Sequence, residues 1–134
     1  MRALVSAIPG LLVLVLAGCV SAAPVQPSTA TFVGTYRHGD TTLVLGKDGT
    51  FTLSDAPSYT GFTDTDGVWD LSPDRVNLTS YESQSIESVF FDAADGRVLY
   101  FGLDLGTDNP RCFQLARKGS GISPLGRDQC ELRP

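Results

Sequence analysis

The sequence predicts an all-β fold, a small antiparallel barrel or sandwich of eight strands. From residue 31 onward, short runs rich in β-branched and aromatic residues alternate apolar and polar positions, as half-buried strands do. Gly, Asp, Pro and Ser interrupt these runs at close intervals and provide the turns that antiparallel strands require. With 134 residues, of which 42% are hydrophobic, the chain can form one packed core, so we expect residues 31–134 to be a single domain.

The turn after the second expected strand predicts its register. A three-residue loop over 47–49, with Gly49 in the left-handed conformation, pairs Leu45 with Phe51 and places both on one face. A two-residue loop would put these side chains on opposite faces. The expected strands are Thr31–Arg37, Thr41–Gly46, Thr50–Ser54, Gly67–Ser72, Arg75–Thr79, Ile86–Asp92, Arg97–Leu103 and Arg111–Ala116.

A second turn contains Pro73 at the position that a type I turn favours. This turn pairs Leu71 with Val76 and Trp69 with Leu78, so that the apolar residues of both strands share one face.

Residues 82–94 allow an alternative. Ile86, Val89 and Phe90 also fit helical spacing, and Thr79 with Glu82 matches a capping box, so a helix here would make the fold α+β. We favour a strand because the β-branched and aromatic run 89–91 leads into an Asp-Gly turn.

The first residues are typical of an export signal. Arg2 precedes an apolar segment, 3–18, that contains no acid and is too short to predict a membrane-spanning helix. The segment ends in Leu16-Ala17-Gly18-Cys19, which resembles the lipobox of bacterial lipoproteins. The resemblance implies that residues 1–18 are a lipoprotein signal peptide and that Cys19 carries diacylglyceryl and palmitate-type acyl chains. The alternative is an ordinary signal peptide, cut after Ala22 or Ala23.

The resemblance also implies a cellular location. In Gram-negative lipoproteins an Asp after the lipidated cysteine retains the protein at the inner membrane, whereas this chain has Val20. We therefore expect a location on the outer membrane, facing the periplasm. Residues 19–30, rich in Pro and small residues, are expected to be a lipidated tether.

Once Cys19 is set aside, two cysteines remain, Cys112 and Cys130. An even pair in an exported chain predicts a disulfide. Closing a loop of about 19 residues contributes on the order of 3 kcal/mol in the chain-entropy model.

The segment 32–78 carries a resemblance to a family. It resembles the G-x-Y, L-x-L, D-G-T-[FY], G-x-W, [IV]-x-L succession of small lipocalin-like barrels in bacterial envelope lipoproteins, including the amino-terminal domain of the NlpE family. The resemblance implies a small barrel. The C-x-x-C motif of that family is absent between Tyr36 and Leu43, so copper binding and stress signalling are not implied. The matching residues are Gly34-Thr35-Tyr36, Thr42–Leu45, Asp48–Leu53, Gly67-Val68-Trp69 and Val76–Leu78.

Nothing in the chain predicts catalysis, a metal or another cofactor. His38 is the single histidine and lies in an expected turn, and no G-x-S-x-G motif is present. The segment 64–67 matches only a fragment of a calcium-binding loop, so we interpret it as part of a hairpin loop. A net charge of −5 argues against nucleic-acid binding.

Two sets of aromatic residues are candidates for binding. The long connection Asp55–Asp64 contains Tyr59 and Phe62, which either form a protein-recognition edge or fold back to plug the barrel mouth. Phe51 and Trp69 are expected to line any ligand cavity inside the barrel.

The leading hypothesis is therefore a lipid-anchored, non-enzymatic binding module for a periplasmic protein partner. A first alternative is a barrel that carries a small apolar ligand. A second is an inhibitor or immunity protein against a cell-wall hydrolase, since an acidic lipoprotein with a long loop is similar to lysozyme inhibitors of the MliC type. The S-G-x-x-Y signature of those inhibitors is not matched by residues 60–64.

Overall fold

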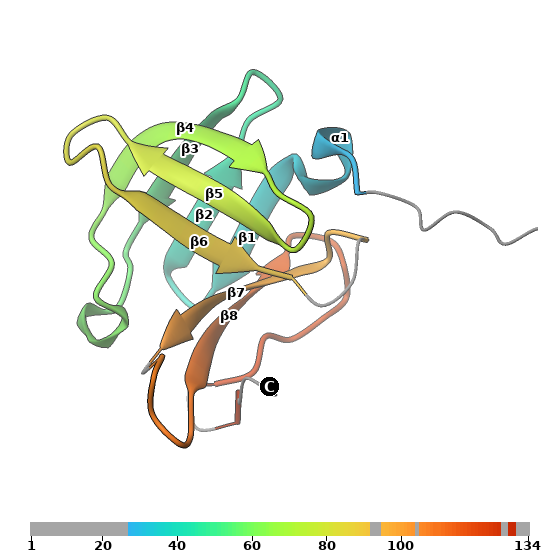
Figure 1. The fold of residues 1–134 in the computed structure, drawn as a ribbon. Helices are drawn as coiled ribbons and strands as arrows, with labels where there is room; N and C mark the ends of the chain where they lie inside the picture. The colour runs from blue at the N-terminus through green and yellow to red at the C-terminus, as the bar shows by residue number, and fades with distance from the viewer. Residues whose placement is uncertain (1–26, 92–94, 104, 127–128, 131–134) are drawn as a thin grey trace, which may run out of the picture.

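The computed structural model describes residues 27–91, 95–103, 105–126 and 129–130, which form a closed barrel of eight antiparallel strands (Figure 1). Each strand pairs with the next, and β8 pairs with β1 to close the barrel. A short helix, α1 (Thr29–Phe32), precedes the strands, and a 3-10 turn, η1 (Ser58–Thr60), lies between β3 and β4. The strands are β1 (Gly34–His38), β2 (Thr41–Leu45), β3 (Thr50–Ser54), β4 (Thr65–Leu71), β5 (Arg75–Ser80), β6 (Ile86–Phe90), β7 (Val98–Leu103) and β8 (Arg111–Arg117).

This architecture confirms the predicted eight-stranded all-β fold. The alternative helix over 82–94 is wrong where the structure describes that segment, because Ile86–Phe90 form strand β6; residues 92–94 lie outside the described residues. Both predicted registers are confirmed. Leu45 pairs with Phe51 around a left-handed Gly49, and Trp69 pairs with Leu78.

Most predicted boundaries agree with the structure to within one residue, but the starts of the first and fourth strands differ by more, and β6 ends at Phe90 rather than at Asp92. The first strand was expected to begin at Thr31, but residues Thr29–Phe32 form α1 and β1 begins at Gly34. The helix is held by residues distant in sequence, since Phe32 is fully buried and the Arg117 guanidinium donates to the Thr31 carbonyl oxygen at 2.8 Å. Similarly, the fourth strand was expected to begin at Gly67, but β4 begins at Thr65 because it pairs with the end of β3, so residues 65–66 are strand rather than loop.

The barrel has two ends, which carry different connections between the strands. At the closed end lie α1 and the turns that join β2 to β3 and β4 to β5. At the opposite end, called the mouth here, lie the connections β1–β2, β3–β4, β5–β6 and β7–β8 (Figure 1). Buried side chains from all eight strands fill the interior between them.

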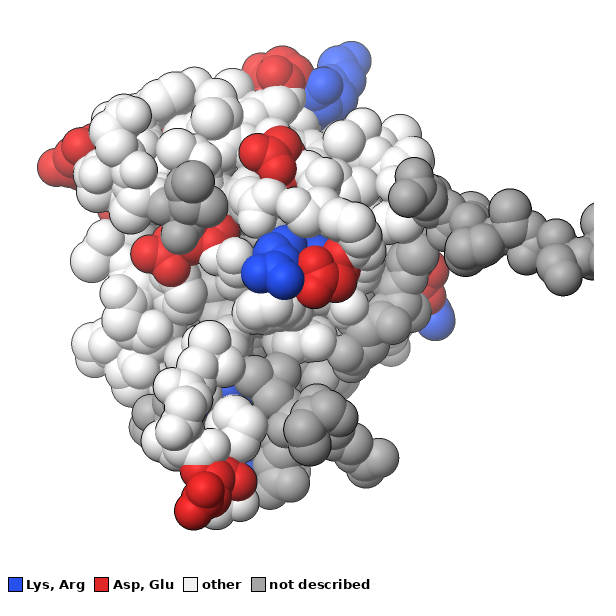
Figure 2. All heavy atoms as spheres, in the orientation of Figure 1, with Lys and Arg blue, Asp and Glu red and all other residues white. Residues whose placement is uncertain are grey.

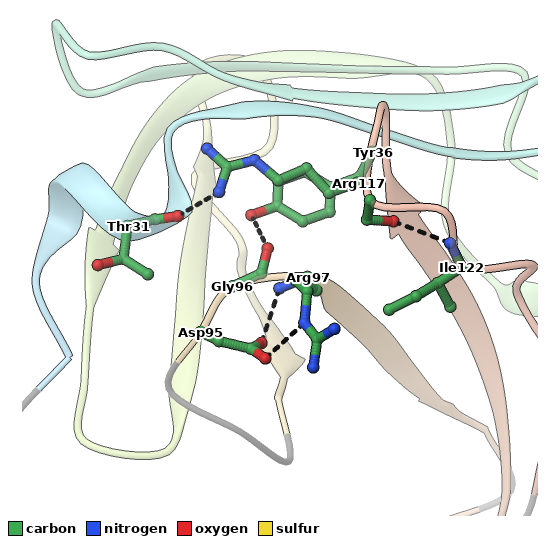
Figure 3. Close-up of polar contacts among 8 residues, drawn as sticks. Thr31, Tyr36, Asp95, Gly96, Arg97, Arg117 and Ile122 are labelled. Carbon is green, nitrogen blue, oxygen red and sulfur yellow. Dashed lines mark hydrogen bonds and ion pairs between the residues drawn. The ribbon is translucent and has the colours of Figure 1, made fainter.

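The buried Phe32 side chain covers the closed end. Polar contacts drawn in Figure 3 hold the same end together. The hydroxyl of the fully buried Tyr36 lies 3.0 Å from the Phe32 carbonyl oxygen and 2.8 Å from that of Gly96, and donates to these acceptors. Burial raises the pKa of Tyr36 to about 12. The Arg117 guanidinium also donates to the Val33 carbonyl oxygen, so β8 holds the segment that precedes β1.

The disulfide between Cys112 and Cys130 is present, with 5.2 Å between the Cα atoms, which confirms the prediction. The Cys112 N–H donates to the Cys130 carbonyl oxygen at 3.1 Å, and both residues are buried. The bond therefore fastens the chain after β8 to the outer surface of that strand.

Candidate functional site

A cavity of about 420 Å³ opens at the mouth, between the β3–β4 connection and the β5–β6 turn. This volume lies in the range of small-molecule sites. The lining residues come from β3, β4, β5, β6 and the two connections: Phe51, Leu53, Gly61, Phe62, Thr63, Thr65, Leu78, Ser80, Glu82, Ser83, Ser85 and Glu87.

The floor and one wall of the cavity are apolar. Phe51, Leu53 and Leu78 are each at least 97% buried and belong to the barrel core. Phe62 reaches in from the β3–β4 connection, and its ring centroid lies 4.1 Å from that of Phe101. An apolar group can therefore dock on this floor against side chains that are already fixed by packing.

Gly67 makes room for the floor. It lies opposite Phe51 on the neighbouring strand, and a Cβ atom there would come within 2.8 Å of the Phe51 ring and 2.0 Å of the Thr79 carbonyl oxygen. Only glycine fits at this position.

Hydroxyl groups line the cavity next to its apolar floor. The Thr65 and Ser80 side chains share a hydrogen bond of 2.7 Å, and Ser80 is 94% buried. The Ser80 hydroxyl oxygen also accepts from the backbone N–H groups of Glu82 and Ser83, at 3.2 and 3.4 Å. These contacts shape the β5–β6 turn as the polar side of the cavity.

Two carboxylates complete this polar side. Glu87 pairs with Leu78 across β5 and β6, and alternation along β6 places it on the inner face with the buried Val89. Glu82 extends the same side from the turn. Within the described part of the chain, neither carboxylate is paired with a cation or hydrogen-bonded. Both are exposed to solvent at the cavity opening.

The β3–β4 connection is held in place by its own hydrogen bonds. The Ala56 N–H donates to the Asp64 carboxylate at 3.2 Å and closes the neck of the loop. The Thr60 hydroxyl donates to the Pro57 carbonyl oxygen at 2.6 Å and accepts from the Phe62 N–H at 3.2 Å. The β3–β4 connection, which carries Phe62, is therefore preformed in the absence of a ligand.

Aromatic rings cover the other side of the mouth. The His38 ring stacks on Phe113 with 4.7 Å between centroids, and Tyr59 meets Phe113 edge-on at 6.1 Å. His38 Nδ1 lies 2.7 Å from the Gln114 carbonyl oxygen, which can only accept, so Nδ1 carries a proton. His38 therefore closes the seam between β1 and β8 and does not line the cavity.

The structure separates the two members of each aromatic pair that the sequence predicted to act together. Phe51 lines the cavity, whereas Trp69 lies toward the closed end and donates its indole N–H to the Gly46 carbonyl oxygen at 2.8 Å. Phe62 folds inward, and Tyr59 stays 46% exposed at the rim. Cys19 lies outside the described residues.

Sequence reasoning missed the polar side of the cavity, above all Glu87. A signal was available, because counting back two residues from the apolar Val89 along a strand reaches Glu87 on the same face.

No protein-family model, curated protein or solved structure matches this chain. Among the described residues, no helix is long and apolar enough to span a bilayer. The same residues contain no group of three or more His, Cys, Asp and Glu side chains arranged to hold a metal ion.

Proposed function

We propose that the protein is an outer-membrane lipoprotein whose barrel binds a small amphipathic ligand in the periplasm, without catalysis. The observation that carries the binding proposal is the mouth cavity, which combines a buried apolar floor with a hydroxyl and carboxylate side. Preformed pockets that join apolar surface to a few convergent polar groups are the usual form of a small-molecule site.

The anchoring proposal rests on the sequence around Cys19. A lipobox-like segment precedes that cysteine, and the Cys112–Cys130 disulfide is compatible with an oxidising compartment. The first described residue, Pro27, precedes α1 at the closed end. A lipid anchor attached on this side leaves the mouth at the opposite end of the barrel, open to the periplasm.

Native mass spectrometry tests the binding proposal. The unlipidated mature chain, residues 19–134 with Cys19→Ser, is recovered from a periplasm and measured before and after denaturation. A non-covalent small-molecule adduct that is lost on unfolding is expected. Thr63→Trp, which fills the cavity from its lining, should remove the adduct, and Thr52→Trp on the exposed outer face of β3 should keep it. An adduct that persists in Thr63→Trp would contradict the site.

Anchoring is tested separately. The full chain should fractionate with membranes and incorporate labelled palmitate, and Cys19→Ala should lose the label. Label retained by the Cys19→Ala variant would contradict lipidation at this residue.

A second candidate function is capture of a protein, including a cell-wall hydrolase. It is favoured by Tyr59, Tyr81 and Leu105, which are 46%, 55% and 63% exposed and lie on three different connections of the mouth. Exposed aromatic and aliphatic side chains grouped at one end suit a protein interface. A pull-down from periplasmic extract in which Tyr59→Ala and Leu105→Ser together fail to reduce recovery of any partner would count against this function.

A further inference from the structure

We infer that the mouth cavity selects a cationic amphiphile, a ligand with an ammonium-type head and a short apolar body. The inference rests on the proposed ligand-binding function and adds the chemical class of the ligand. Three features of the structure carry it: the asymmetric lining of the cavity, the pairing state of its carboxylates, and the distribution of charge between the two ends of the barrel.

The lining first sets the orientation of the ligand. Its apolar residues lie on β3, β5 and the β3–β4 connection, whereas its carboxylates lie on the β5–β6 turn and at the start of β6. A ligand that fits both sides has an apolar part over Phe51 and Leu53 and a polar head beside Glu82 and Glu87. The lining contains no Lys, Arg or His among the described residues, so an anionic head would meet only like charge and hydroxyl groups.

The acids of the cavity differ in their pairing from two acids at the closed end. At the closed end, Asp74 accepts from the Arg75 guanidinium and Asp95 from that of Arg97, at 2.9 and 2.6 Å. The hydrogen bonds that these acids accept hold both pKa values below the ordinary range of an aspartate. In the described structure Glu82 and Glu87 have no such partner, so their charge is available to a bound cation.

The wider charge distribution points the same way. The described residues of the four mouth connections include acids and no Lys or Arg. Figure 2 shows acid at the β5–β6 turn, at the left edge of the view. An excess of acids around a cleft raises the local concentration of cations and speeds their capture. The acids are Asp40, Asp55, Asp64, Glu82 and Asp108.

Three probes with one apolar chain and different heads test the inference: octyltrimethylammonium, octyl glucoside and octyl sulfate, each below its critical micelle concentration. Isothermal titration calorimetry on the unlipidated mature chain should give the tightest binding for the cation, about tenfold tighter than for the sulfate. Added salt should weaken binding of the cation and leave the glucoside unchanged, because only the charged head is screened.

Variants test whether the two carboxylates of the cavity cause the preference for the cation. Glu82→Gln with Glu87→Gln should weaken binding of octyltrimethylammonium about fivefold, as the loss of two exposed ion pairs predicts. Asp70→Asn with Asp74→Asn removes the same charge from outside the cavity lining and should leave binding unchanged. Equal affinity for all three probes would overturn the cationic class and leave the ligand-binding function standing. No binding of any probe, together with no adduct in native mass spectrometry, would overturn both.

Discussion

Glu87 lies directly opposite Leu78 on neighbouring strands, and both side chains belong to the inner face of the barrel. Leu78 is 98% buried, whereas Glu87 is exposed at the cavity opening. A carboxylate on an inner face contributes nothing to core packing, so the fold is less stable than it would be with an apolar residue there. A residue that lowers stability at such a position is characteristic of a binding site.

The first prediction follows from this pair. Glu87→Leu should raise the free energy of unfolding by about 0.5–1 kcal/mol, because a leucine there extends the apolar face beside Leu78. The same change should weaken binding of octyltrimethylammonium. Urea denaturation measures the first effect and calorimetry the second. Ser88→Leu, one residue along the strand and on its outer face, is the control and should not stabilise. A loss of stability in Glu87→Leu would contradict the inner-face assignment.

Gly67→Ala should destabilise the barrel by about 1–3 kcal/mol, since its Cβ would overlap the Thr79 carbonyl oxygen and press on the Phe51 ring. The change should also disturb the cavity floor. Gly126→Ala adds the same atom where no neighbour lies within 4 Å and serves as the control. Equal urea midpoints for the two variants would show that Gly67 is not sterically confined.

Tyr36→Phe should cost about 1–2 kcal/mol, because it removes the hydroxyl that donates at the closed end and leaves the carbonyl oxygens of Phe32 and Gly96 without that donor. The loss is measured by urea denaturation at neutral pH. A variant as stable as the parent would show that these contacts do not hold α1 in place.

Ionisation of Tyr36 should also affect how the free energy of unfolding depends on pH. Burial raises the pKa of Tyr36 from 10.0 to about 12, so the folded state holds this proton more tightly than the unfolded chain. Its contribution is complete below pH 10.0 and is lost as the pH rises toward about 12. Denaturation of the parent and of Tyr36→Phe across this window should show a steeper decline in the parent. Parallel curves would contradict a raised pKa.

Cys112→Ser with Cys130→Ser should lower stability by about 3 kcal/mol, as expected when a loop of this length is no longer closed. The far-ultraviolet circular dichroism spectrum should keep its β character, because the eight strands close without the segment after β8. Complete loss of the β signal at neutral pH would show that the disulfide is required for the barrel itself.

Local chemistry was sufficient to predict much of the fold. Two local features determine the hairpin of β2 and β3: the left-handed Gly49 and the alternation of Leu43, Leu45, Phe51 and Leu53. The Pro73 turn likewise determines the pairing of Trp69 with Leu78. The helix over Thr29–Phe32 could not be predicted in this way, because Arg117 holds that segment from the other half of the chain.

The candidate site was only partly predictable. Phe51 was identified because large apolar residues on an inner face must line any cavity, but nothing local indicates where along the barrel axis each residue lies. Trp69 shares that inner face and yet lies toward the closed end. Alternation from Val89 puts Glu87 on the inner face, but its place opposite Leu78 follows only once β5 and β6 are aligned.

The most direct test of the account is an amide NMR titration of the unlipidated mature chain with octyltrimethylammonium. Binding at the mouth predicts concentration-dependent shifts of the Thr65, Ser80 and Glu87 amides, and an unchanged indole N–H signal from Trp69 at the far end. Shifts centred on Trp69 or on the outer face, with the three mouth amides unmoved, would contradict the claim that the mouth cavity is the binding site.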